Sequence, residues 1–211
     1  LALFFLYTAS IAVGILAALV LKKTLFRAAA SPFVMELPPY RLPALRTTVQ
    51  YIRQRIGDFV RKAFSVILFA SLVVWFLQTF DFRLRLVASP ADSMLADIGG
   101  ALSVLFYPLG WRDWRLTAAL ITGLTAKEAV LSTLAVLTGA ETGVAVSALF
   151  PSVPAAAAFC VFVLLYPPCA AAMAAVRRET SGRFTLGLFA FQTAVAYLCA
   201  MLVFRVGLWL S

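Results

Sequence analysis

The chain has 211 residues, of which 63% are hydrophobic and only 13% are charged, and its mean hydropathy is +0.97. A soluble domain would be about half apolar and about a quarter charged, so these values exclude an ordinary soluble globule, a disordered chain and a disulfide scaffold. Histidine is absent, which excludes histidine-dependent catalysis and histidine metal ligands.

Leu1–Leu21 is the first apolar segment long enough to cross a bilayer, whose hydrocarbon core requires about 20 helical residues. The chain opens at Leu1 already inside this run, without the basic start of a secretory signal. We therefore expect this sequence to be the C-terminal part of a longer multi-pass membrane protein, with the lipid bilayer as its surroundings.

A basic segment follows, between Lys22 and Lys62. It holds nine lysines and arginines against Glu36 and Asp58. Because membrane-length apolar runs flank it, the positive-inside rule favours a cytoplasmic loop over a nucleic-acid surface, and we expect no nucleic-acid partner. Within it, Ser31–Pro43 (SPFVMELPPYRLP) holds four prolines and cannot be helical throughout. Apolar residues alternating with basic ones over 52–62 predict an amphipathic lead-in helix.

The remaining apolar segments predict an all-α, polytopic transmembrane protein. With Leu1–Leu21, they give five long helices and one short or re-entrant helix, because Leu95–Leu109 has only 15 residues. If Leu95–Leu109 spans, the C-terminus is external; if it re-enters, the C-terminus is cytoplasmic, and the sequence leaves both open. We divide the chain into residues 1–62 and 63–211. The other long segments are Ala63–Phe80, Leu116–Thr138, Ala155–Val176 and Thr185–Leu210.

Lys127 and Glu128 stand in the middle of an otherwise apolar segment. Each ionised group at the bilayer centre costs about 2.5–3.5 kcal/mol, so both must face protein, water or partners. On a regular helix Thr125, Glu128 and Ser132 would share one polar stripe, while Lys127 would point elsewhere, to a helix C-terminus or another carboxylate. We favour a carboxylate that lines a substrate or ion path; the alternative is a structural ion pair with another part of the protein.

Tyr166-Pro167-Pro168-Cys169 interrupts the next apolar segment. Two prolines remove two backbone donors, so carbonyl groups around 163–166 lose their helical partners and need protein, water or a cation. Cys169 begins the second half-helix, where free amides favour a thiolate, and Met173 lies one turn further on. A soft transition-metal site is one interpretation; a proline kink with a packing cysteine is the other.

Weaker signals complete the set of candidate residues. Gln192 and Cys199 are seven residues apart, so they share a helix face and could line the same path or simply pack. Cys160 lies before the proline break and is expected to pack in the core. Phosphate-loop, zinc-site and serine-nucleophile signatures are all absent from the sequence, so we expect no enzyme active site in this chain.

With these residues in view, the chain resembles the C-terminal half of the membrane domain of the ferrous iron transport protein B (FeoB) family. The resemblance runs along nearly the whole length, in four segments that keep their order. They are SPFVMELPPYRLP at 31–43, Leu109-Gly110-Trp111 with Trp114-Arg115, GLTAKEAVLST at 123–133, and LLYPPCAAAMAAVRRE at 164–179.

The resemblance implies that residues 63–211 form a gate-type transmembrane domain with broken helices, the second of two gate regions related to those of nucleoside permeases. It implies that Cys169 is the gate cysteine that contacts Fe²⁺ and that Glu128 is the acidic position of the same region. The family also carries an N-terminal GTPase domain and a first gate region, which this chain would need as partners. The family pattern has one proline before the cysteine, so Pro167 is a departure.

The resemblance therefore predicts passage of Fe²⁺ across the bacterial inner membrane into the cytoplasm, with Fe²⁺ as transported substrate and no permanently bound cofactor. Cys169 and Glu128 are the predicted metal-contacting residues and Lys127 is a charge partner. Two alternatives are an organic-solute permease, for example for nucleosides, and a structural module that couples to a nucleotide-binding domain. Homo-oligomerisation is left open. The predicted path-lining residues are Thr125, Ser132, Tyr166, Met173, Gln192 and Cys199.

Overall fold

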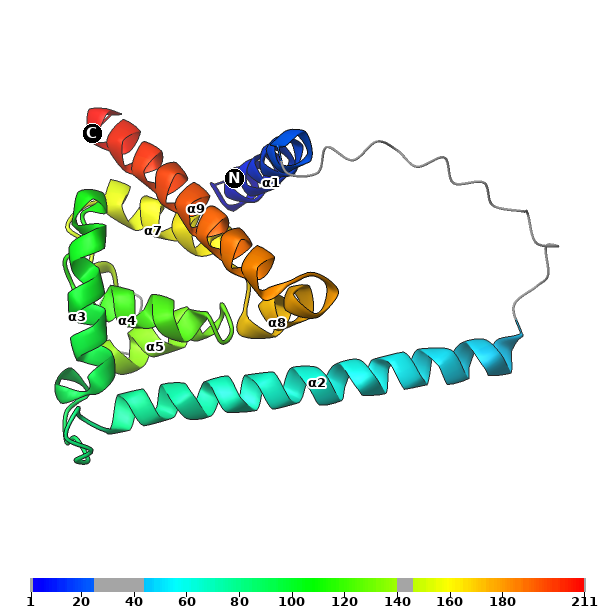
Figure 1. Ribbon diagram of the computed structural model, residues 1–211. Helices are drawn as coiled ribbons and strands as arrows, with labels where there is room; N and C mark the ends of the chain where they lie inside the picture. The colour runs from blue at the N-terminus through cyan, green and yellow to red at the C-terminus, as the bar shows by residue number, and fades with distance from the viewer. Residues whose placement is uncertain (1, 25–43, 140–145, 211) are drawn as a thin grey trace. The chain divides into compact units, whose positions relative to one another are not determined.

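The computed structural model describes residues 2–24, 44–139 and 146–210, and its regular elements there are helices apart from one β-bridge between Phe80 and Leu86. The predicted all-α fold is confirmed (Figure 1). The chain divides into two compact units, Leu1–Lys62 and Ala63–Ser211. The proline-rich stretch Ser31–Pro43 lies outside the described residues, so its predicted conformation is not tested.

The first unit contains α1 (Ala2–Thr24) and the beginning of α2 (Leu45–Thr79). α1 is apolar on all sides and ends on Lys22 and Lys23, whose charges suit the negative end of the helix dipole. α2 begins well before Ala63, as predicted. With 35 residues it is about 50 Å long, so its polar first half extends past the apolar stretch Phe64–Thr79.

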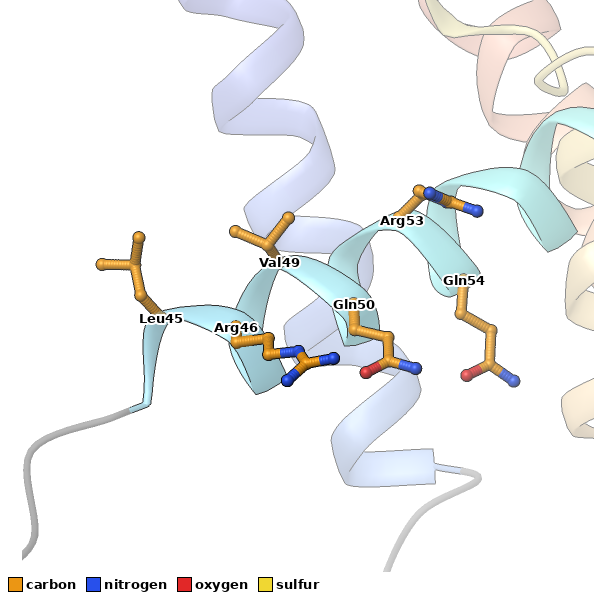
Figure 2. Close-up of a pocket in the computed structure, with 6 residues that line it drawn as sticks. All are labelled: Leu45, Arg46, Val49, Gln50, Arg53 and Gln54. Carbon is orange, nitrogen blue, oxygen red and sulfur yellow. The ribbon is translucent and has the colours of Figure 1, made fainter.

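A hollow lies along the start of α2, and all the residues that line it belong to this one helix (Figure 2). It is lined by guanidinium, amide and aliphatic groups, with neither a carboxylate nor a thiol among them. It is therefore a basic surface of the lead-in helix and has no ligands for a metal ion. The lining residues are Leu45, Arg46, Val49, Gln50, Arg53 and Gln54.

The second unit turns sharply after α2. The Asp81 carboxylate accepts hydrogen bonds from the amides of Arg83 (2.8 Å) and Arg85 (2.9 Å), which closes the turn. Ser93 then caps α3 (Met94–Phe106), and Asp113 caps α4 (Trp114–Gly123). Between these helices the chain bends by 104°, and Gly110 adopts a φ of +82° that disfavours other residues. Leu95–Leu109 is thus a short helix followed by a sharp bend.

The most important correction concerns Leu116–Thr138. The structure divides it into α4, ending at Gly123, and α5 (Ala129–Thr138), with residues 124–128 outside any helix. The predicted stripe of Thr125, Glu128 and Ser132 is therefore wrong, because a shared face requires a continuous helix through all three. The next apolar segment, predicted as Ala155–Val176 with an interruption at its two prolines, is divided there as predicted. Its two halves are α7 (Val153–Leu165) and α8 (Ala170–Glu179).

α9 (Gly182–Leu210) packs along α7 in an antiparallel pair (Figure 1). Four fully buried alanines, Ala155, Ala158, Ala196 and Ala200, let the two backbones approach closely. At one end of the seam, a Cβ on Gly207 would lie 2.7 Å from the Cβ of Pro154. These small residues hold α7 tightly against α9. The helix that leads into the proline break is therefore firmly packed.

An aromatic cluster joins α3, the bend before α4, and α7. Trp111 is fully buried, stacks on Phe106 at 5.4 Å and donates from Nε1 to the Ala155 carbonyl at 3.0 Å. Phe162 meets both rings edge-on. On α9, Tyr197 Oη donates to the Leu105 carbonyl at 3.0 Å. The bent α3–α4 pair is therefore held against the α7–α9 pair by aromatic packing and two long-range hydrogen bonds.

Large apolar side chains also point outward over much of the described chain. Phe69 and Leu186 are each 71% exposed and Trp209 is 86% exposed. The described helices that could cross a membrane are 6–24, 153–179 (α7 with α8) and 182–210, and the bent pair α3–α4 would add a fourth span. The exposed apolar side chains and the several candidate membrane-spanning helices show that the chain is a multi-pass membrane protein.

Candidate functional site

Two helix breaks lie in the second unit, and they have different origins. In the α7–α8 break, Pro167 and Pro168 lack amide hydrogens, and Tyr166 and Cys169 take extended ψ values of 165° and 158°. In the α4–α5 break, the chain from Leu124 to Glu128 contains no proline. There Gly123 leaves room for other side chains, since a Cβ on it would overlap both Val130 and Tyr166 Oη.

The two breaks are in direct contact. The first amide of α8, Ala170 N, donates to the Leu124 carbonyl across the gap at 2.7 Å. Lys127 Nζ donates to the carbonyls of Leu164 (3.0 Å) and Tyr166 (3.2 Å), at the C-terminal end of α7. Of the two partners predicted for Lys127, a helix C-terminus or another carboxylate, the structure shows the helix C-terminus. Each break thus supplies the partners that the other has lost.

Tyr166 lies at the centre of this meeting point. It is 4% exposed, and its ring stacks on that of Phe162 with the centroids 5.7 Å apart. Lys127 Nζ lies over the same ring, 5.0 Å from its centroid. Its hydroxyl sits in the space beside Gly123 and has no hydrogen-bond partner in the described structure. Lys127 and Tyr166 also lie within electrostatic range of the Cys169 thiol. One ammonium, one phenol, one thiol and two backbone carbonyls therefore gather at this point.

Residues 3–55 match the family model described as ferrous iron transport protein B C terminus, and residues 60–183 match the gate model described as nucleoside recognition. The second match includes both helix breaks. The chain belongs to the FeoB family. Neither matching model is a GTPase domain.

Several curated FeoB proteins are similar along almost all of this chain. The Fe(2+) transporter FeoB of Methanocaldococcus jannaschii is 33% identical over 96% of it, that of Campylobacter jejuni 34% over 95%, and that of Staphylococcus aureus strain COL 32% over 96%. The chain spans 31%, 35% and 31% of these relatives, about a third of their length. No solved structure matches it significantly.

The two predicted metal-contacting residues lie at the two breaks. Cys169 is the N-cap residue of α8; it is half-buried and its thiol caps no amide. Glu128 is the N-cap residue of α5, also without a side-chain cap, and is exposed. In the described part of the chain its carboxylate forms neither a hydrogen bond nor an ion pair. The two residues thus occupy equivalent positions, each directly before the second helix of its pair.

The predicted path-lining residues lie on three helices, α5, α8 and α9, and in the two helix breaks. Thr125 Oγ1 donates to the Thr122 carbonyl at 2.7 Å, and the exposed Ser132 donates to the Ala129 carbonyl at 3.1 Å. Met173 is half-buried one turn after Cys169, and its amide donates to the Cys169 carbonyl at 3.1 Å. On α9, Gln192 and Cys199 are half-buried, and Gln192 Oε1 lacks a partner in the described structure.

Lys127, Tyr166 and Cys169 are therefore brought together, whereas no hydrogen bond or ion pair of the described residues joins Glu128, Ser132, Gln192 or Cys199 to them. Cys160, expected in the core, is instead exposed. It follows Ala158 and Phe159, which face the core, and so points away from it. Within the described ranges, no three cysteine, aspartate or glutamate side chains form a group that could hold a metal ion.

Sequence reasoning missed a buried hydroxyl pair beside the α4–α5 break. Thr122 and Thr133 are joined through their Oγ1 atoms at 2.9 Å, and they are only 2% and 8% exposed. Since the two residues are eleven positions apart, they could not meet on a straight helix, and only the break brings them together. A helix-periodicity pattern therefore contained no signal for this pair.

Proposed function

We propose that this chain forms the C-terminal part, including the second gate region, of a cytoplasmic-membrane Fe²⁺ transporter. The observation that carries the proposal is the contact between two helix breaks, with a thiol and backbone carbonyls that lack helical amides at the crossing and a carboxylate beside it. Broken helices that meet inside a membrane protein are the usual site of ion binding in transporters. The relatives' description as Fe(2+) transporters supports Fe²⁺ as the substrate.

Cys169 serves as a transient ligand of Fe²⁺. Its thiol stands at the start of α8, within electrostatic range of the Lys127 ammonium. A thiol also suits a transition metal better than it suits Mg²⁺ or Ca²⁺. This preference gives the path a means of selecting iron over the more abundant hard cations.

Glu128 provides a carboxylate ligand or compensates the charge of the passing ion. Its lack of a partner in the described structure and its exposure leave the carboxylate free for this role. Conduction requires several weak sites, so Thr125, Ser132, Tyr166, Met173, Gln192 and Cys199 offer hydroxyl, thioether, amide and thiol contacts along the way. No permanently bound cofactor is part of this proposal.

The complete transport cycle requires more than this chain. The missing two thirds of the relatives' length leave room for the N-terminal GTPase domain and the first gate region, which we propose as its partners together with lipid. The basic start of α2, with the exposed Arg46 and Arg53, is the surface available on the cytoplasmic side. Charge reversal of Arg53 and Arg55 should weaken cross-linking to the GTPase domain if that surface couples the two.

The test is anaerobic uptake of radioactive Fe²⁺ by cells that express the full-length transporter. Cys169→Ser and Glu128→Ala should each lower uptake at unchanged membrane abundance. Two matched controls remove the same groups elsewhere: Cys160→Ser on the exposed side of α7, and Glu179→Ala at the end of α8. Normal uptake in both Cys169→Ser and Glu128→Ala would contradict the assignment.

A nucleoside permease is the second candidate, favoured by the description of the matching gate model. Gln192 Oε1 and Tyr166 Oη, both buried and without partners in the described structure, are groups that an organic solute could bind. Competition separates the two functions. Excess nucleoside should leave Fe²⁺ uptake unchanged if iron is the substrate, and should reduce it if the gate binds nucleosides.

A further inference from the structure

The α7–α8 break leaves four carbonyl groups, from Val163 to Tyr166, without helical amides. Pro167 and Pro168 have no amide hydrogen to offer to Val163 and Leu164. The Ala170 amide, which a continuous helix would direct to Tyr166, donates instead to Leu124. Unsatisfied carbonyls are costly inside a membrane, so the end of α7 presents a concentration of negative partial charge that requires a positive group.

That positive group is the side chain of Lys127. Its Nζ contacts the Leu164 and Tyr166 carbonyls at 3.0 and 3.2 Å and faces the Tyr166 ring at 5.0 Å. The Cys169 thiol lies within its electrostatic range. Backbone carbonyls, an aromatic face and a thiol are all groups that bind cations. The ammonium is thus surrounded as a bound cation would be.

We propose that Lys127 is a tethered cation that occupies the ion site of the α7–α8 break, and that Fe²⁺ passes only by displacing it. The identity of the displacing ion rests on the function proposed above. Two positive charges cannot share one set of carbonyls and one thiol, so the ammonium and the metal exclude each other. Lys127 therefore keeps the break satisfied and closed when no iron is passing.

The local structure allows this exchange. Lys127 belongs to the non-helical segment between α4 and α5, and its flexible four-carbon stem can withdraw the ammonium without moving a helix. Meanwhile the backbone bond from Ala170 to Leu124 continues to join the two breaks. Displacement of Lys127 therefore opens the ligand set while the crossing stays assembled.

The experiment measures protection of Cys169 from alkylation by Fe²⁺, in the full-length transporter in anaerobic membrane vesicles, with mass spectrometry of the Cys169 peptide. Lys127→Gln removes the charge but keeps donor hydrogens for the carbonyls. If the ammonium leaves its site in about one tenth of the molecules, half-protection in Lys127→Gln should require about tenfold less Fe²⁺. Lys127→Arg, which keeps the charge, and Arg205→Gln, which removes an exposed cation from α9, should resemble the parent protein.

The outcomes separate the two proposals. Equal half-protecting concentrations in Lys127→Gln and the parent protein would overturn the tethered-cation role and leave the iron site standing. Absence of protection in every protein would overturn Cys169 as an iron ligand, and the tethered-cation proposal with it. A second measurement requires no substitution at Lys127: in the parent protein Cys169 should react faster with an anionic than with a cationic methanethiosulfonate, and a faster cationic reaction would contradict the proposal.

Discussion

The two helix breaks differ in what creates them. The α7–α8 break is caused by its own local sequence. Pro167 and Pro168 have no amide hydrogen, so they cannot donate backbone hydrogen bonds in any surroundings. The α4–α5 break has no proline, and it is held open by contacts from α7 and α8: Tyr166 against Gly123, Ala170 to Leu124, and Lys127 to the end of α7. The first break is therefore autonomous, and the second depends on the first.

The largest effect is expected from Lys127→Met, which removes the strongest link between the breaks. Two charge-assisted hydrogen bonds are lost and two carbonyls stay without a donor, so we expect about 3 kcal/mol of destabilisation. Thermal unfolding of the detergent-solubilised full-length transporter measures it. Arg205→Met, which removes an exposed cation from α9, should unfold at the parent temperature; equal losses in both variants would show that Lys127 has no special role.

Gly123→Ala should come next, because its methyl group overlaps Tyr166 Oη and Val130. Overpacking of this kind costs about 2 kcal/mol. We expect this loss of stability to affect the α4–α5 break. Gly100→Ala in α3 is the matched control, since nothing lies within 4 Å of its Cβ position. The same thermal assay should show a lower unfolding temperature for Gly123→Ala only, and a parent-like Gly123→Ala would refute the contact.

A smaller effect is expected at the buried threonine pair. Thr122→Val and Thr133→Val each remove one side of a 2.9 Å hydrogen bond, so each should cost about 1 kcal/mol. A double-mutant cycle tests whether the hydroxyls act together: the double variant should cost less than the sum of the single ones. Strict additivity would mean that the α4–α5 break does not bring them into contact.

The smallest effect is expected from Pro167→Val, which restores a single proline before the cysteine and keeps three side-chain carbons at this fully buried position. Pro168 still denies an amide to the Leu164 carbonyl, so Lys127 keeps its partner and the break persists. We expect a stability change below about 1 kcal/mol, within the range for hydrophobic swaps of similar volume, and Fe²⁺ uptake near that of the parent. Loss of uptake at normal membrane abundance would show that the double proline is itself required.

The same difference explains what the sequence could predict. The all-α membrane fold, the early start of α2 and the proline break follow from local composition, and each was predicted. The α4–α5 break was not, because it depends on Tyr166, more than 40 positions from Gly123 along the chain. The periodic stripe of Thr125, Glu128 and Ser132 failed for this reason, since a helical wheel assumes the continuity that a distant contact removes.

The same distinction between local and distant causes applies to individual site residues. The contact of Lys127 with a helix end was predictable because a cation inside a membrane needs a negative partner. Its particular partners, the Leu164 and Tyr166 carbonyls, were identified only by the structure. Cys160 was misjudged as a core residue because α7 is apolar on every side, so its sequence gave no indication of which face is buried.

The central claim is that iron passes where the two breaks meet, and one cross-linking measurement tests it most directly. In the full-length transporter, Leu124→Cys should form an oxidative cross-link with Cys169, because the Leu124 carbonyl bonds to the amide that follows Cys169. The account predicts that the cross-link abolishes Fe²⁺ uptake and that a reductant restores it, whereas Leu131→Cys on the exposed face of α5 should give neither effect. A cross-link that forms fully and leaves uptake unchanged would contradict the account.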